Sequence, residues 1–163
     1  VTACHDLNND QYVLLMRPKV RVLNMSSKIA ESIIRAYYQA LNEKDMISFF
    51  DLLADDVVHD VNEGVQEHGK TAFRFFMNRV NRNYDEQVSD ISIMFDESCN
   101  KAGAEFMVEG RYLESEFALP EAKGQHYKIK GGTFFELRDN LIVRVTSYYN
   151  LAEWVKQVEQ TDY

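Results

Sequence analysis

The spacing of apolar residues changes once along this chain, and the change restricts the folds that the chain can adopt. Up to about residue 83, apolar side chains such as Ile29 and Ile33 recur at helical spacing. Beyond about residue 87 they alternate with polar ones, so that within 103–115 Phe106 and Glu109 lie on opposite faces. Helices followed by a run of strands indicate an α+β fold, with the helices packed on one face of an antiparallel sheet.

The pattern predicts three helices, a short strand between the second and the third, four long strands and a final helix. Ser26 or Ser27 and Asp45 are suited to cap the first two helices. The pair Gly131-Gly132 inside a strand predicts a bulge or a sharp bend, and a curled sheet leaves a pocket beneath the helices. The expected helices cover about 26–42, 46–54, 70–83 and 151–158, the expected strands 57–61, 87–97, 103–115, 126–138 and 141–149, and 64–69 is expected to be a polar loop.

Length and charge narrow the class of protein. A chain of 163 residues fits one domain with a real core, expected over residues 25–163, with 1–24 an N-terminal extension whose status is open. The net charge of −8 argues against nucleic acid and against an anionic membrane as partners. Cys4 and Cys99 are too few for a disulfide framework, which favours a reducing, cytoplasmic setting.

The stretch Leu53–Gly64 poses the main question about function. It contains a valine-rich strand that carries Asp60, and a carboxylate at a half-buried position costs several kcal/mol unless a partner compensates. Either Asp60 points to water, or it lines a cavity and acts as a base with a raised pKa. Side chains alternate along a strand, so Asp60 with Asn62, or His59 with Val61, should face the pocket. Asp60 with Asn62 is the preferred alternative.

Several segments of the sequence resemble the nuclear-transport-factor-2-like superfamily, and within it the ketosteroid-isomerase-related, or SnoaL-like, branch. The resemblance covers roughly residues 26–158. It is carried by Tyr37–Asp45, Leu53–Val57, His59–Gly64, Gly132–Leu137 and Tyr148–Trp154.

The resemblance implies a cone-like α+β barrel of the cystatin-like kind, a curved antiparallel sheet around three N-terminal helices, usually dimeric. In ketosteroid isomerases a carboxylate moves a proton beside a carbonyl group, while a tyrosine and a protonated acid hold the enolate oxygen. The match places Tyr37 on that tyrosine and Asp60 close to the base, with Val61 in the strictly aligned place. Thr133 or Gly132 stands where the second acid would be.

These observations lead to an isomerase-like or cyclase-like hypothesis with Asp60 as base and Tyr37 as donor to the oxyanion. The alternative is a non-catalytic module that binds a small hydrophobic ligand or mediates assembly. Epoxide hydrolysis ranks last, because no second pocket aspartate can be placed beside Arg111 or Arg144. We expect a homodimer, no cofactor and no metal. Residues expected to contact the ligand are His59, Asn62, Phe73, Met77, Tyr112, Thr133, Tyr149 and Trp154.

Overall fold

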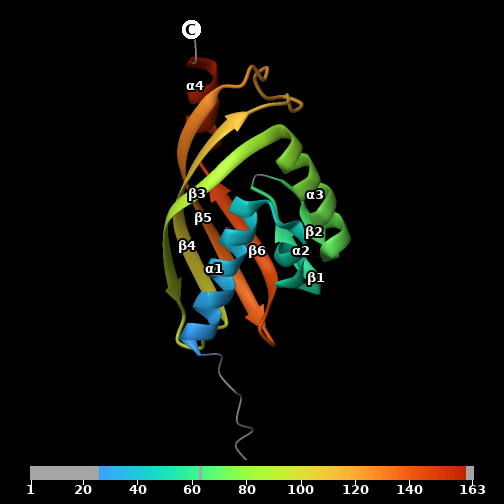
Figure 1. Cartoon of the computed structure of the whole chain (residues 1–163), viewed down its shortest axis with the longest axis vertical. Coiled ribbons are helices and arrows are strands. Elements are labelled where there is room, and N and C mark those ends of the chain that lie inside the picture. The colour runs from blue at the N-terminus through green and yellow to red at the C-terminus, as the bar shows by residue number, and fades with distance from the viewer. Residues whose placement is uncertain (1–25, 63, 161–163) are drawn as a thin grey trace, which may run out of the picture.

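The computed structural model describes residues 26–62 and 64–160, so the expected extension 1–24 lies outside the described residues. The α+β prediction is confirmed: a curved, unclosed sheet carries its helices mainly on one side (Figure 1). The helices are α1 (Ser27–Glu43), α2 (Met46–Asp51), α3 (Gly69–Asn83) and α4 (Leu151–Gln160). The strands are β1 (Leu53–Asp60), β2 (Gln66–His68), β3 (Tyr84–Phe95), β4 (Lys101–Tyr112), β5 (His126–Arg138) and β6 (Leu141–Tyr149).

The strand order is β2-β1-β6-β5-β4-β3, which places β1 next to β6, the last strand of the described chain. Four of the five pairings are antiparallel, as expected, but β1 runs parallel to β6 and makes the sheet mixed. In Figure 1, α1 crosses the front of the sheet, α2 and α3 lie beside it, and α4 stands at the upper end of β5.

The helix starts follow from the capping residues that the sequence contains. The Ser26 hydroxyl accepts a hydrogen bond from the Ile29 amide at 3.3 Å, and the Asp45 carboxylate accepts one from Ser48 at 3.1 Å. Several boundaries differ from expectation; β3 and β4, for example, each lie two to three residues earlier in the chain. The second helix ends at Asp51, because the chain turns there into β1, and the polar loop contains the short strand β2, whose pairing with β1 local composition does not reveal.

Two hydrophobic clusters hold the helices to the sheet. The larger one joins α1, α2 and α3 to the inner face of the sheet through fully buried side chains such as Ile34, Phe49 and Val145. The smaller one seats Trp154 of α4 against Tyr112, with ring centroids 4.9 Å apart. The division matters because a cavity lies between the two clusters.

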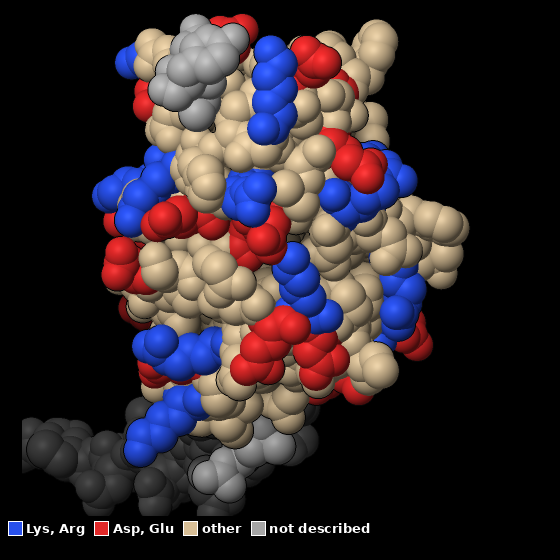
Figure 2. All heavy atoms as spheres, turned by 45° about the horizontal axis from the view of Figure 1, so that its top comes forward, with Lys and Arg blue, Asp and Glu red and all other residues tan. Residues whose placement is uncertain are grey.

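The outer face of the sheet is charged, with both signs interspersed. Neighbouring strands β4 and β5 place Glu109 opposite Lys128 at 3.2 Å, and Lys130 lies 3.3 Å from Glu105. Blue and red side chains are likewise mixed over the face of the molecule in Figure 2. A surface of this kind offers no extended basic stripe on that face for a nucleic-acid backbone.

The bulge expected at Gly131-Gly132 is absent. Pairing of β5 with β4 continues without a register shift from Glu136 to His126, so both glycines sit in regular ladder positions. Gly131 serves packing instead: a Cβ there would lie 2.6 Å from Cε2 of Phe106, which is only 8% exposed. The ring of Phe106 therefore occupies the space that a side chain at position 131 would need.

We expect Gly131→Ala to destabilise the fold by about 1–3 kcal/mol, because the added methyl group must displace the Phe106 ring. Gly132→Ala is the matched control, since the nearest atom to its added Cβ is the Ala104 carbonyl oxygen at 3.6 Å. Urea unfolding of the two variants measures both effects. Equal free energies of unfolding for the two variants would contradict the steric account.

Candidate functional site

A cavity of about 350 Å³ lies between the helices and the inner face of the sheet. Its wall is mostly apolar and aromatic, which suits a small organic ligand. Eight residues proposed from the sequence line it, although their roles in binding stay predictions. They are Tyr37, His59, Asn62, Phe73, Met77, Thr133, Tyr149 and Trp154.

His59 faces this cavity and is held there by rings and by a carboxylate. It is 4% exposed, and its ring stacks on Phe73 with centroids 4.0 Å apart and planes at 10°. Phe76 meets the same ring edge-on at 4.5 Å. On the other side, Nδ1 of His59 lies 3.1 Å from Oε2 of Glu67, which reaches across from β2.

The environment of His59 keeps the imidazole neutral and fixes its proton. Burial lowers the pKa of His59, and the opposing influence of Glu67 and Asp60 offsets this only in part. An ionised carboxylate such as Glu67 can only accept, so the Nδ1–H tautomer satisfies the contact. Nε2 then carries a free lone pair, and it makes no hydrogen bond within residues 26–62 and 64–160. A group of this kind can accept a proton from a bound ligand.

Asp60 lies on the opposite face of β1, and the preference for it as the cavity-facing residue is wrong. The parallel ladder pairs Asp60 with Thr146, whose hydroxyl donates to the carboxylate at 2.6 Å. Gln66 donates at 2.7 Å, and Arg144 forms an ion pair. Burial raises the pKa of Asp60, but the hydrogen bonds from Gln66, Thr146 and Arg144 together lower it to about 2. β1 ends at Asp60, so the alternation stops there, and Asn62 reaches the cavity lining independently.

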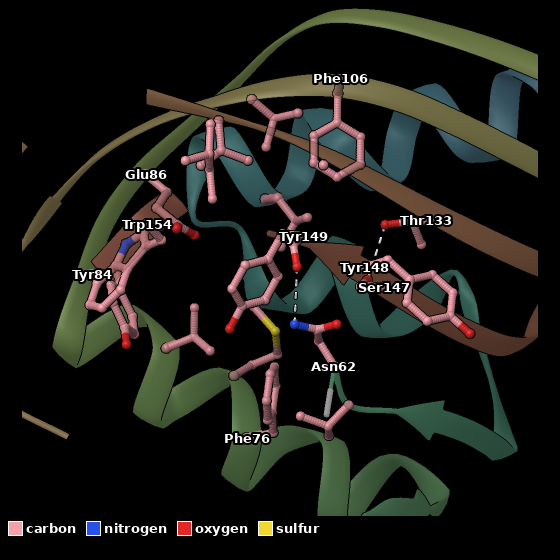
Figure 3. A pocket seen from close by; sticks show the side chains of 18 of the residues that line it. Asn62, Phe76, Tyr84, Glu86, Phe106, Thr133, Ser147, Tyr148, Tyr149 and Trp154 are labelled. Carbon is pink, nitrogen blue, oxygen red and sulfur yellow. Dashed lines mark hydrogen bonds between the residues drawn. The ribbon is translucent and has the colours of Figure 1, made fainter. Parts of the chain in front are cut away.

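Three hydroxyl groups converge on another part of the cavity wall. Thr133 and Ser147 share a hydrogen bond at 3.0 Å between adjacent strands (Figure 3). Tyr38 lies close to Thr133, and its hydroxyl is the one buried side-chain polar atom in the described part of the chain without a hydrogen-bond partner. Burial raises the pKa of Tyr38, so the hydroxyl keeps its proton and is available to donate to a ligand.

Tyr37, the donor implied by the family resemblance, also lines the cavity, but its ring is packed among aromatic neighbours. Phe49 lies 4.7 Å and Phe135 5.1 Å from its ring centroid. Burial raises the pKa of Tyr37, and the neighbouring Tyr38 adds to this rise. The prediction from helical spacing named Tyr37 as buried and missed Tyr38, although Tyr38 follows Ala30 and Ile34 at intervals of four residues.

The far end of the cavity is built around α4. Trp154 packs on Tyr84 and Tyr127, and Glu86 lies beside them in the wall, as Figure 3 shows for the labelled side chains. Tyr112, expected in the lining, is instead fully buried behind it, because its ring stacks on Tyr84 and its hydroxyl accepts a hydrogen bond from the Glu116 amide at 2.7 Å. Sequence reasoning missed Glu86, because the strand was expected to begin at residue 87, whereas β3 begins at Tyr84.

Neither a metal site nor a membrane helix is found in the described residues. No group of three or more His, Cys, Asp or Glu side chains within 26–62 and 64–160 is arranged to hold a metal ion. In the same residues no helix is both long and apolar enough to cross a bilayer.

Comparison with known domains agrees with this architecture. The sequence matches the SnoaL-like domain over residues 34–145, which is more than half of the chain. The chain belongs to the SnoaL-like family. No curated protein matches it.

The match to similar solved structures extends over almost the whole length of those proteins. A candidate polyketide cyclase from Pseudomonas putida KT2440 is 45% identical, with a TM-score of 0.77 over 79% of this chain and 97% of that one. Another from Silicibacter sp. TM1040 is 41% identical, with a TM-score of 0.79 over 83% and 98%. An epoxide hydrolase from M. tuberculosis, 16% identical with a TM-score of 0.65 over 82% and 91%, shows the fold alone.

The geometry of Asp60 predicts a structural contribution that depends on pH. Because its pKa falls from the usual 3.8 to about 2, the carboxylate stabilises the fold above pH 4 and loses this effect as the pH falls toward 2. We expect Asp60→Asn to cost about 1–2 kcal/mol at pH 7 and progressively less below pH 4.

Chemical denaturation at a series of pH values measures this difference. Asp56→Asn is the control, because Asp56 forms a comparable bidentate pair with Arg138 but is 68% exposed in its side chain, where such pairs contribute little. If the Asp60→Asn variant is as stable as the unmodified protein at pH 7, the contacts of Asp60 with Arg144 and Thr146 do not stabilise the fold, and this account is contradicted.

Proposed function

We propose that this protein binds an uncharged, ring-containing small molecule in the cavity and moves a proton at a carbon beside a carbonyl group, with His59 as the base. The observation that carries the proposal is the buried His59–Glu67 pair, which leaves Nε2 of a neutral imidazole free in an aromatic cavity. Proton transfer of this kind needs no cofactor, because a positioned general base supplies the chemistry.

The hydroxyl groups of Tyr38, Thr133 and Ser147 complement that base. Proton removal beside a carbonyl group develops negative charge on the carbonyl oxygen, and donors in a dry site stabilise it. The Tyr38 hydroxyl has no hydrogen-bond partner among the described residues, so it can donate to the carbonyl oxygen of a ligand. Tyr37 lines the same cavity, so the donor role given to it from the resemblance stays a prediction.

The charges around the cavity favour a neutral ligand. Arg79 lines the cavity, but its guanidinium lies 3.5 Å from the Glu116 carboxylate and 5.2 Å above the Phe76 ring. Asn83 donates to the same carboxylate at 2.9 Å. The Arg79 cation is thus already balanced by a carboxylate, which disfavours an anionic ligand, and the aromatic rings of the wall favour a ring-containing one.

The relatives support the same class of chemistry. Two structures more than 40% identical to this chain are described as candidate polyketide cyclases. Ring closure of a polyketide joins a carbon beside one carbonyl group to another carbonyl carbon, and the first step removes a proton. A cavity histidine acting as base fits that requirement, and isomerisation of a ketone begins with the same step.

We expect His59→Gln to slow proton exchange in a bound ketone by about 100-fold, the usual scale of a general base. The substrate is β-tetralone, a two-ring ketone, and the measurement is deuterium incorporation beside its carbonyl group in heavy water, followed by proton NMR. In the unmodified protein the rate should fall only at a pH below the usual pKa of histidine, since burial lowers the pKa of His59 and protonation removes the base.

His68→Gln is the matched control, because His68 is exposed on β2 next to Glu67 and outside the cavity lining. Its exchange rate should equal that of the unmodified protein. Unchanged exchange in His59→Gln, with folding verified by circular dichroism, would exclude His59 as the base.

A non-catalytic binding module is the second candidate, and the position of Asp60 favours it. The carboxylate that the family resemblance nominated as base is engaged with Arg144 and Thr146 on the outer face of the sheet. The same β-tetralone measurement separates the two candidates. Saturable binding with no acceleration of exchange over buffer supports the binding module and contradicts the catalytic proposal.

The expected homodimer also stays a prediction, and the outer face of the sheet indicates where to test it. Phe134 and Tyr148 are 59% and 56% exposed there, with ring centroids 6.1 Å apart. We expect Phe134→Glu to shift the protein from dimer to monomer in sedimentation equilibrium, because a charge at a packed interface is unfavourable. Lys128→Glu, on the same strand and already exposed, is the control. A monomeric unmodified protein would contradict the homodimer.

A further inference from the structure

One row of residues across three strands forms a polar site that the proposed chemistry does not use. Glu86 of β3 pairs with Gly110 of β4, and Gly110 pairs with Tyr127 of β5. Gly110 leaves a gap in this row, because a Cβ there would lie 2.7 Å from the Tyr127 hydroxyl and 2.9 Å from Cγ of Glu86. Through that gap the Tyr127 hydroxyl donates to Oε1 of Glu86 at 2.6 Å.

Glu86 is half-buried, and its carboxyl lacks the cation that usually accompanies an acid in such a place. No Lys, Arg or His of residues 26–62 and 64–160 forms an ion pair with it, and Lys44 pairs instead with Asp85 at 2.6 Å. Tyr127 is its hydrogen-bond partner in the described part of the chain, which leaves Oε2 without one. Burial raises the pKa of Glu86, with the Tyr127 hydrogen bond and the more distant Lys44 acting the other way.

The carboxyl lies in the cavity wall, next to the aromatic rings of Tyr84 and Trp154 (Figure 3). Thr133 and Ser147 lie on the other side of the cavity in the same view. A ring-shaped ligand seated between the two groups would meet hydrogen-bond donors at one end and a carboxyl acceptor at the other. Buried polar groups left unpaired cost free energy that a correctly placed ligand group removes.

We propose that Glu86, positioned by Tyr127 across Gly110, is a hydroxyl-binding subsite of the cavity, where Oε2 accepts a hydrogen bond from a phenolic or alcoholic hydroxyl of the ring ligand. This inference rests on the proposed function, because it assumes that the cavity binds a ring compound. It adds the substrate class: a hydroxylated ring ketone, with the carbonyl group toward the Tyr38 end and a hydroxyl group at Glu86. The ligand of the proposed function is uncharged, so the group placed at Glu86 is a neutral hydroxyl and not an ammonium ion.

The test compares three ring compounds that share one carbon skeleton: naphthalene, β-naphthol and its methyl ether. The methyl ether keeps the oxygen but has no hydroxyl proton. Dissociation constants follow from fluorescence titration of the folded protein. We expect the unmodified protein to bind β-naphthol about tenfold more tightly than the methyl ether, the scale of a hydrogen bond to a carboxylate.

Glu86→Gln is the informative variant, because it keeps the size of the side chain and an oxygen for Tyr127. Its remaining amide group can only donate, so β-naphthol and the methyl ether should bind with about equal affinity. Glu109→Gln, on the outer face of β4, is the control and should keep the tenfold preference. A merely structural role of Glu86 would change the melting temperature of the variant without changing this preference.

The outcomes separate this subsite from the function on which it rests. Failure of all three compounds to bind would overturn the ring-binding proposal and the subsite with it. Equal binding of all three to the unmodified protein, or a tenfold preference that persists in Glu86→Gln, would overturn the subsite alone. Deuterium exchange in β-tetralone depends on His59 and would remain as independent support for the proton-transfer proposal.

Discussion

The pairing of β1 with β6 is the constraint on which the rest of the site depends. Their parallel register places Asp60 beside Thr146 and Arg144 on the outer face, and His59 beside the fully buried Val145 on the inner face. A slip of one residue would exchange these faces. The ion pair and hydrogen bonds of Asp60 outside, and the ring contacts of His59 inside, therefore stabilise the same register from both sides of the sheet.

The chemistry of the cavity follows from that register. His59 enters an aromatic environment in which burial favours the neutral imidazole, while Glu67 from the adjacent β2 fixes the proton on Nδ1. Thr133 and Ser147 bring two hydroxyl groups to one side of the wall, and Gly110 lets Tyr127 hold a carboxyl on another. His59, Thr133, Ser147 and Glu86 all reach the cavity from strand positions, so the sheet places most of the polar groups of the site.

Local sequence patterns were sufficient where local physics decides the structure. The caps at Ser26 and Asp45 and the alternation along β4 appeared as expected. Local sequence patterns could not predict the orientation of Asp60, because it depends on pairing with β6, more than 80 residues away in the sequence.

The same limit explains what else was missed. Gly131 was expected at a bulge or bend but accommodates the Phe106 ring. Glu86 lay outside the expected strand 87–97, and its place in the cavity wall depends on its neighbours on β4 and β5. The family resemblance correctly gave the fold, whereas the assignment of a base required the pairing of particular strands.

The protonation state of His59 tests the central claim most directly. Nitrogen-proton NMR of the imidazole rings, with exposed His68 and His126 as internal references, should show His59 as the Nδ1–H tautomer, titrating below 6.5. Addition of β-tetralone should shift the Nε2 resonance of His59 selectively. An Nε2–H tautomer, or a titration at 6.5 or above like that of an exposed histidine, would contradict the assignment of His59 as the cavity base.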